Sequence, residues 1–210
     1  MIWTRLIALL LLATVHAPSM AIEEPDYEVL RRLDAPDVEL RRYAPYVVAQ
    51  VRIDGASADR ADSDGFRTLA GYIFGKNKGE RRLEMTAPVT REAEPVKLEM
   101  TAPVTRSADA SGFVVQFVLP KGVTLATAPE PNDPRVQLRE VPASVVAVIR
   151  YSGFWSQSNY DEHLERLQAA LRDAKIGWTG EPTLSRYNGP MTPWFLRRNE
   201  IWLRVEGTGR

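Results

Sequence analysis

The segment NGPMTPWFLRRNE, residues 188–200, contains the densest group of side chains in this sequence that could bind a ligand. Its glycine and prolines favour an extended turn. Apolar side chains in such a turn need another surface to pack against, and here they are Met191, Trp194 and Phe195. Arg197 and Arg198 follow directly and suit charge-assisted hydrogen bonds to carboxylates. The segment is therefore interpreted as part of a ligand site, or else as a cap in which the rings cover a core and the arginines are solvated.

Metal ligation and catalysis find little support in the residue types. His163 is the one histidine after residue 21, and a histidine at the edge of a helix stripe is more often a packing residue than a ligand. Met85 and Met100 could reach a metal, but both lie on apolar faces of predicted strands, where packing is the expected role. The lack of cysteine excludes thiol catalysis and cysteine-built zinc sites. No P-loop, GxGxxG or HExxH motif occurs, so the sequence predicts a protein that is not an enzyme.

A first helix is predicted over residues 63–75. Its apolar residues recur at i, i+3, i+4 and i+7 and are Phe66, Leu69, Ala70 and Ile73. Asp62 or Ser63 would cap the helix and Gly75 would end it. The side facing away from the sheet would form a small, apolar wall made of Arg67, Ala70, Gly71 and Phe74.

A second helix is predicted over residues 158–177, where the periodicity is stronger. Its stripe consists of Tyr160, Leu164, Leu167, Leu171 and Ala174. Ser158 and Asp161 form a capping box at its start, and Gly177 would end it. His163 stands beside this stripe.

A long repeat relates two parts of the chain. Residues 39–55 (ELRRYAPYVVAQVRIDG) and 137–153 (QLREVPASVVAVIRYSG) align without a gap at a constant offset of 98. Both are rich in β-branched residues, which predicts a long strand bent at Pro45 in one copy and at Pro142 in the other.

A short repeat is perfect. LEMTAPVTR occurs at residues 83–91 and again at 98–106. Each copy alternates apolar and polar residues, which predicts a half-buried strand, and the six residues EAEPVK between them would connect a hairpin. Pro88 and Pro103 would confine these strands to sheet edges or bulges. The repeat is therefore interpreted as scaffold.

The order of these elements predicts an α+β domain. Further strands are expected at residues 113–120 and 200–205, so strand, helix and strands occur twice in succession. Two similar halves, at about 27–122 and 136–206, would meet across the crossover at 128–135. A pseudo-two-fold would pair their sheets into an antiparallel, distorted β-barrel flanked by two helices, with a ligand cleft between the halves.

The N-terminus, residues 1–21, resembles a cleaved signal peptide, with Arg5 before an apolar run and small residues at Ser19 and Ala21. Residues 22–210 would then form a single exported domain without a stable membrane span, in the periplasm or outside the cell. The full chain has 27 basic and 27 acidic residues, which argues against a nucleic-acid partner.

Several ordered motifs resemble the SOUL or haem-binding-protein family. GKNKGERRLEMTAPV is followed by FVLP, PEPNDPRVQLRE, the RYSG strand and RYNGPMTPWFLRRNEIWL, so the likeness covers about residues 27–205. The resemblance implies a barrel of two similar halves with two helices, in agreement with the repeat, and a tetrapyrrole ligand such as haem or a porphyrin. The doubled MTAPV is similar to a variant of bacterial members.

In the family, the first helix and the closing loop line the ligand groove. The residues here that the resemblance places in this groove are Phe66, Arg67, Ala70, Phe74, Met191, Trp194, Phe195, Arg197 and Arg198. The family's histidine near the first strand is absent, since no histidine lies between residues 22 and 77, and the metal ligands stay unknown. Glu200 is interpreted either as an interior carboxylate of the kind that related effector-binding domains use against cations, or as a surface ion pair with Arg197 or Arg198.

The leading hypothesis is a non-enzymatic protein that sequesters or transports haem or another tetrapyrrole. A second hypothesis is a module for other flat hydrophobic or cationic effectors. A third assigns hydrolysis of a bound ligand to Glu200.

Overall fold

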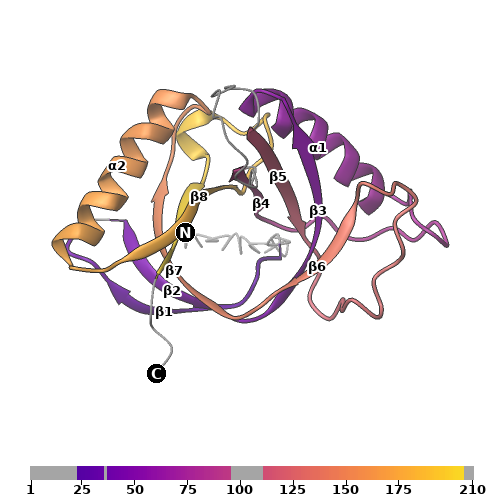
Figure 1. Ribbon diagram of the computed structural model, residues 1–210, viewed down its shortest axis with the longest axis horizontal. Helices are drawn as coiled ribbons and strands as arrows, with labels where there is room; N and C mark the ends of the chain where they lie inside the picture. The colour runs from indigo at the N-terminus through magenta and orange to yellow at the C-terminus, as the bar shows by residue number, and fades with distance from the viewer. Residues whose placement is uncertain (1–22, 36, 96–110, 206–210) are drawn as a thin grey trace, which may run out of the picture.

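The chain forms one curved antiparallel sheet that carries a helix on each side of its convex face, as the computed structural model shows (Figure 1). The structure describes residues 23–35, 37–95 and 111–205. The helices are α1 (Ala58–Ile73), α2 (Gln157–Asp173) and the short 3-10 turn η1 (Trp194–Leu196). The strands are β1 (Tyr27–Arg32), β2 (Val38–Tyr43), β3 (Tyr46–Asp54), β4 (Val89–Pro95), β5 (Ser111–Val118), β6 (Gln137–Val141), β7 (Ser144–Tyr151), β8 (Trp178–Arg186) and β9 (Asn199–Val205). This architecture confirms the predicted fold class.

The two halves of the chain exchange strands. The sheet order is β1-β2-β7-β9-β8-β4-β5-β3-β6, so β2 pairs with β7 of the second half and β3 pairs with β6. The run β3-β5-β4 then matches the run β7-β9-β8, and β4 and β8 join the halves again. Such reciprocal pairing is what a pseudo-two-fold between similar halves produces.

The prediction of one long, bent strand in each copy of the long repeat is wrong in one respect. Each copy forms two separate strands, with the break at the proline. β2 ends at Tyr43 and β3 begins at Tyr46, while β6 ends at Val141 and β7 begins at Ser144. Proline has no N–H to donate to a ladder. The break lets the two pieces of each copy pair with different neighbours, which is how the halves exchange strands.

Helix α1 differs from its prediction in its start and in the face that it buries. It begins at Ala58, five residues before the predicted start, and its buried residues are Ala61, Gly65, Leu69, Tyr72 and Ile73. The helix approaches the sheet most closely at Gly65, where an added Cβ would lie 2.6 Å from Cγ2 of Val115. This close approach turns Phe66 towards the helix edge, where the side chain is 46% exposed.

Helix α2 buries the stripe that its sequence predicts. Leu167, Ala170 and Leu171 are buried, and Tyr160, Leu164 and Ala174 pack against the same core cluster. The cap is Ser156, which accepts a hydrogen bond from the Asn159 amide, and not the predicted Ser158. The left-handed residue after the helix is Lys175, with φ 57°, and not Gly177.

The short repeat is not the strand that its alternation predicts. In the first copy only the last three residues belong to a strand, since β4 begins at Val89. Thr86 and Thr90 are only 6% and 5% exposed, so the expected polar face is buried. The EAEP part of the predicted connection lies within β4, which pairs with β5. The second copy, with Met100, lies outside the described residues.

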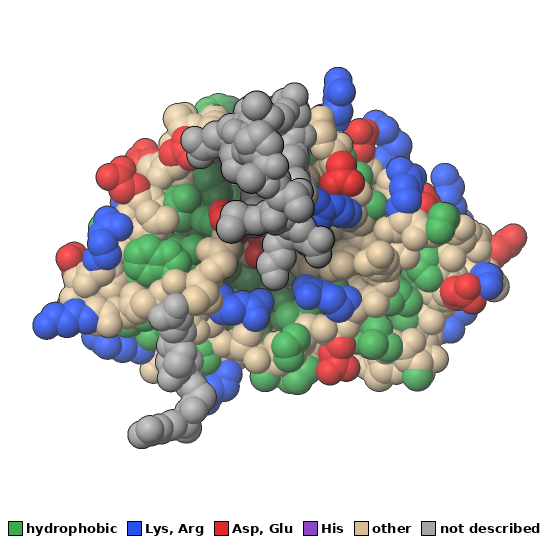
Figure 2. All heavy atoms as spheres, viewed as in Figure 1, with side chains coloured by type: hydrophobic (Ala, Val, Ile, Leu, Met, Phe, Trp, Pro, Cys, Tyr) green, Lys and Arg blue, Asp and Glu red, His purple; other side chains and the backbone are tan. Residues whose placement is uncertain are grey.

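The surface carries both signs of charge. On the face in Figure 2, Lys and Arg side chains are interspersed with Asp and Glu around the rim. Among the described helices, none combines the length and the apolar character that a membrane span needs.

Candidate functional site

A cleft of about 430 Å³ opens between α1, the sheet and the segment that follows β8. We call it the α1 cleft. Its apolar lining consists of Phe66, Val89, Val115, Trp155, Leu184 and Pro190. Strands β4, β5 and β8 thus form its floor, α1 forms one wall, and Trp155 and Pro190 come from two loops of the second half. The cleft therefore lies between the halves, as the repeat predicts.

Phe66 is held in position by packing. Its ring contacts the buried Phe117 ring edge to face, with the centroids 5.3 Å apart. Because Phe66 remains 46% exposed, it presents an apolar surface to the cleft without leaving a hole in the core. Four ligand-groove candidates were predicted on the first helix. In the described part of the chain, Phe66 is the one of the four that lines the α1 cleft.

A second cleft of about 290 Å³ adjoins the first, and we call it the α2 cleft. The two clefts share five lining residues, which are Asp59, Arg91, Trp155, Leu184 and Arg186. The first turns of both helices line the α2 cleft, at Ala58 and at Gln157. Helix N-termini carry partial positive charge, so this compartment adds to the positive potential of the arginines.

A charged cluster stands at the boundary between the two clefts. Arg91 lies on β4, Arg186 on β8 and Asp62 on α1. Asp62 Oδ1 is 3.4 Å from Arg91 Nε, and Asp62 Oδ2 is 2.8 Å from Arg186 Nη1. Burial lowers the pKa of Arg186, Asp62 opposes this effect, and the neighbouring charge of Arg91 lowers the pKa further. The cluster thus places two guanidiniums against one carboxylate in a partly apolar cleft.

Trp155 forms the wall that both clefts share. Its indole N–H donates to Asn199 Oδ1 at 2.9 Å, and Asn199 is buried. The guanidinium of Arg186 lies 4.7 Å from the Trp155 ring centroid, and that of Arg197 lies 4.3 Å from it. Cation–π contacts of this kind hold a planar side chain in a fixed orientation.

Both arginines of the closing loop make contacts within the protein. Arg197 donates to the carbonyls of Thr192 and Pro190 at 2.8 and 2.9 Å, which fixes the loop. Arg198 pairs with Glu24 at 2.7 Å and with Glu200 at 2.9 Å. Their predicted role towards ligand carboxylates stays a prediction, and in this geometry each guanidinium already has acceptors.

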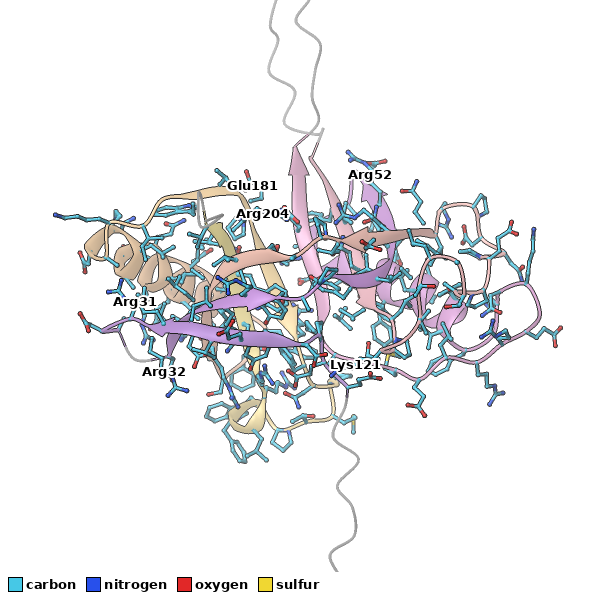
Figure 3. The ribbon with its side chains drawn as sticks, turned by 90° about the horizontal axis from the view of Figure 1, so that it is seen from below. Arg31, Arg32, Arg52, Lys121, Glu181 and Arg204 are labelled. Carbon is cyan, nitrogen blue, oxygen red and sulfur yellow. The ribbon has the colours of Figure 1, made fainter. Side chains whose placement is uncertain are left out.

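The apolar side chains of the closing loop are exposed. Met191 is 94% exposed, Trp194 48% and Phe195 58%. Trp194 stacks on Phe154, a lining residue of the α2 cleft, with centroids 5.2 Å apart. Turn η1 projects at the same end of the molecule as Lys121, opposite the end that carries Arg204 (Figure 3). Trp194 therefore borders the α2 cleft without lining it.

The remaining candidates on the first helix lie apart. Arg67 is paired with Asp64 at 3.2 Å on the exposed surface, and Phe74 is 59% exposed just after the helix ends. Ala70 packs against the core cluster beneath α1 and does not face away from the sheet as predicted. This packing accompanies the close approach of α1 to the sheet at Gly65.

Glu200 is an interior residue and not part of a surface ion pair. Its carboxylate accepts hydrogen bonds from Arg41, Arg198, Tyr187 and Trp202 at 2.8 to 3.1 Å. Burial raises the pKa of Glu200, but the charges of Arg41 and Arg198 outweigh that effect and hold the pKa below its ordinary 4.5. Glu200 lines neither cleft.

The weak metal candidates occupy packing positions. His163 stacks on Tyr151, with centroids 4.2 Å apart, and its Nδ1 lies 2.7 Å from the Asn159 carbonyl oxygen. Met85 packs against the core cluster beneath α1. Within the described ranges, no group of three or more His, Asp or Glu side chains is arranged to hold a metal ion.

Sequence reasoning missed the residues that join the clefts. Arg91 ends the first copy of the short repeat and was interpreted as a strand residue of the scaffold, and Arg186 precedes the closing loop and was given no role of its own. Trp155 stands in GFWSQS, and this pair of aromatic residues directly before a helix cap was the available signal. The pairing of β4 with β8 brings the two arginines together, and no local pattern contains that pairing.

Known proteins match both the sequence and the fold. The family model described as SOUL heme-binding protein matches residues 22–204. Heme-binding protein 2 from Homo sapiens is 28% identical over 199 residues, which cover 91% of this chain and 90% of that protein.

Two solved structures share the fold. The C-terminal domain of EcmrR has a TM-score of 0.57 at 15% identity, covering 80% of this chain and 96% of that chain. A hydrolase from Listeria innocua has a TM-score of 0.55 at 14% identity, covering 82% and 94%. At such identities the likeness shows the fold alone.

Proposed function

As the chain belongs to the SOUL heme-binding protein family, we propose that it binds haem or another tetrapyrrole in the α1 cleft. We propose further that it sequesters or carries this ligand without transforming it. The family and heme-binding protein 2 from Homo sapiens support the ligand class, and the cleft supports its place in this chain.

The observation that carries the proposal is the α1 cleft itself. A volume of about 430 Å³ lies in the usual range of small-molecule sites, roughly 300–1,000 Å³. Its walls offer the Phe66 ring and the Trp155 ring to a flat apolar ligand. The partly buried Arg91 and Arg186 beside them suit the acidic edge of such a ligand. Aromatic walls with cations at one side are the combination that a tetrapyrrole requires.

The ion pairs and hydrogen bonds of the interior carboxylates support binding without turnover. Glu200 is held by two arginines and two further donors, and it lines neither cleft. Asp62 is paired with Arg91 and Arg186. A carboxylate with matched cations is a weak general base, and it offers little to a cationic effector. The geometry therefore favours neither a hydrolytic role nor a cation-binding role for Glu200.

Titration of the purified protein with hemin and with metal-free protoporphyrin IX tests the proposal. We expect saturable binding of both with similar affinity, because the cleft contacts the ring and its acids. An iron-dependent Soret shift together with much tighter hemin binding would point to axial ligation instead. Absence of binding by either compound would contradict the proposal.

A pair of variants tests the location. Phe66→Ala removes an exposed ring from the cleft wall, and we expect both porphyrins to bind at least about tenfold more weakly, a change of only about 1.4 kcal/mol. Leu125→Ala is the matched control, since Leu125 is 48% exposed and outside both clefts. Unchanged affinity in Phe66→Ala would move the site elsewhere.

We also propose that the protein is exported, on the strength of the signal pattern in residues 1–21. The intact mass of protein recovered from the periplasm should then correspond to a chain that begins at Ile22. A soluble cytoplasmic pool that retains Met1 would contradict export.

A further inference from the structure

The charged side chains at the boundary between the two clefts carry one more positive than negative charge. The side chains of Asp62, Arg91 and Arg186 are only 17%, 13% and 21% exposed, so two cations and one anion are largely removed from water. Asp59, the one acid among the residues that line both clefts, is exposed to solvent. Because an uncompensated charge in a partly apolar site is costly, the cluster favours one further anion.

Two of the arginine donors have no acceptor within the described chain. Nη1 of Arg91 and Nε of Arg186 are buried and make no hydrogen bond there. The 2.8 Å contact between Asp62 Oδ2 and Arg186 Nη1 lacks hydrogen-bond geometry and is an ion pair only. Buried donors are nearly always satisfied in folded proteins, so unmatched donors beside a cleft point to a ligand.

Aromatic rings orient the two guanidiniums. Arg91 lies over the Phe113 ring at 5.1 Å, and Arg186 lies over the Trp155 ring at 4.7 Å. With its face against a ring, a guanidinium has its edge left for hydrogen bonds, and that edge matches a planar carboxylate. One carboxylate carries a single negative charge and neutralises the cluster, whereas a doubly charged phosphate would leave it negative.

We infer that Arg91 and Arg186 form a receptor for one carboxylate of the ligand, with Asp62 holding the two arginines in place. This inference rests on the proposed function, and it specifies the orientation of the ligand. A tetrapyrrole enters with one propionate directed to the boundary between the clefts, and its second propionate stays on the solvent side. The cleft therefore distinguishes ligands by whether they carry at least one free acid.

A series of esters tests the inference on the full chain without any mutation. Mesoporphyrin IX, its monomethyl ester and its dimethyl ester are titrated in one detergent-containing buffer, with tryptophan fluorescence as the readout. We expect the diacid and the monoester to agree within about twofold and the dimethyl ester to bind at least about tenfold more weakly. Equal affinity for all three would overturn the receptor. A stepwise loss with each ester group would overturn the assignment of a single carboxylate.

Arginine variants separate recognition from folding. Arg186→Met keeps the length of the side chain and its contact with Trp155 while it removes the charge excess. We expect it to bind the diacid at least about tenfold more weakly and the dimethyl ester as the parent does. Arg91→Met should lower the affinity for the diacid relative to that for the dimethyl ester (the acid-to-ester ratio) in the same way. It can therefore replace Arg186→Met in the test if that variant does not fold. Arg42→Met is the control, since Arg42 forms an exposed pair with Glu28.

The outcomes distinguish this inference from the proposed function. Variants that leave the acid-to-ester ratio unchanged would overturn the receptor, while porphyrin binding by the parent would still support the function. A parent protein that binds no porphyrin would contradict both.

Discussion

Arg41 and Glu200 form a buried ion pair between the two halves of the sheet, with Nη1 of Arg41 3.1 Å from each carboxylate oxygen of Glu200. The residues are 159 positions apart in the sequence, on β2 and β9, and β7 lies between these strands. Arg41 is 3% exposed and Glu200 is fully buried. The pair therefore stabilises the exchange of strands, and the carboxylate is a structural group.

Removing the carboxylate should destabilise the fold strongly. Glu200→Gln removes the carboxylate that the buried Arg41 and the partly buried Arg198 share, although Glu39 and Glu24 still pair with them, and breaking a buried pair in this way costs roughly 3–5 kcal/mol. Chemical denaturation of parent and variant measures the loss in the free energy of unfolding. Glu28→Gln is the control, because its exposed pair with Arg42 should contribute no more than about 1 kcal/mol. A loss in Glu200→Gln as small as that of the control would contradict the structural role.

Acid should weaken the protein through the same group. Arg41 and Arg198 hold the pKa of Glu200 in the folded state below 4.5, its ordinary value, against the effect of burial. The stability that this lowered pKa contributes is fully present above about pH 4.5 and is lost as the pH falls through the folded-state pKa. Denaturation measured between pH 7 and pH 2.5 should show this decline, and Glu200→Gln should reduce its slope. An identical slope in parent and variant would assign acid sensitivity to other carboxylates.

The closing loop should contribute to binding more than to folding. Trp194→Ala combined with Phe195→Ala removes rings that are 48% and 58% exposed, so the fold should survive. Because Trp194 stacks on Phe154 at the edge of the α2 cleft, we expect porphyrin affinity to fall at least about tenfold. Circular dichroism and a porphyrin titration check both parts. His163→Ala should bind as the parent does, and an unfolded double variant would show that the rings belong to the core.

The fold could be predicted from the sequence because its signals are local or repeat at a fixed offset. The stripe on α2 and the β-branched runs each lie within one element, and the offset of 98 residues revealed the two halves. The strand breaks could not be predicted, since a proline within a long strand permits a bend as readily as a change of partner. Only the pairing of β2 with β7 decides between these outcomes.

The candidate site was predictable only in part. Phe66 and Pro190 belong to segments that the sequence singled out, and both line the α1 cleft. Arg91 and Arg186 could not be singled out, because they meet through the pairing of β4 with β8 across 95 residues of chain. The exposure of Phe66 also depends on Gly65, whose lack of a side chain sets how closely α1 approaches β5. The periodicity of a sequence does not predict which distant strands pair or how closely a helix packs on a sheet.

Paramagnetic NMR tests the central claim most directly. Hemin is added to isotope-labelled protein, with gallium protoporphyrin IX as the diamagnetic reference, and the broadening of each backbone amide signal is measured. We expect the strongest broadening at Phe66, Val115 and Leu184, which line the α1 cleft. Broadening centred on the concave pocket around Tyr46 and Arg204, with the α1 cleft unaffected, would contradict the account.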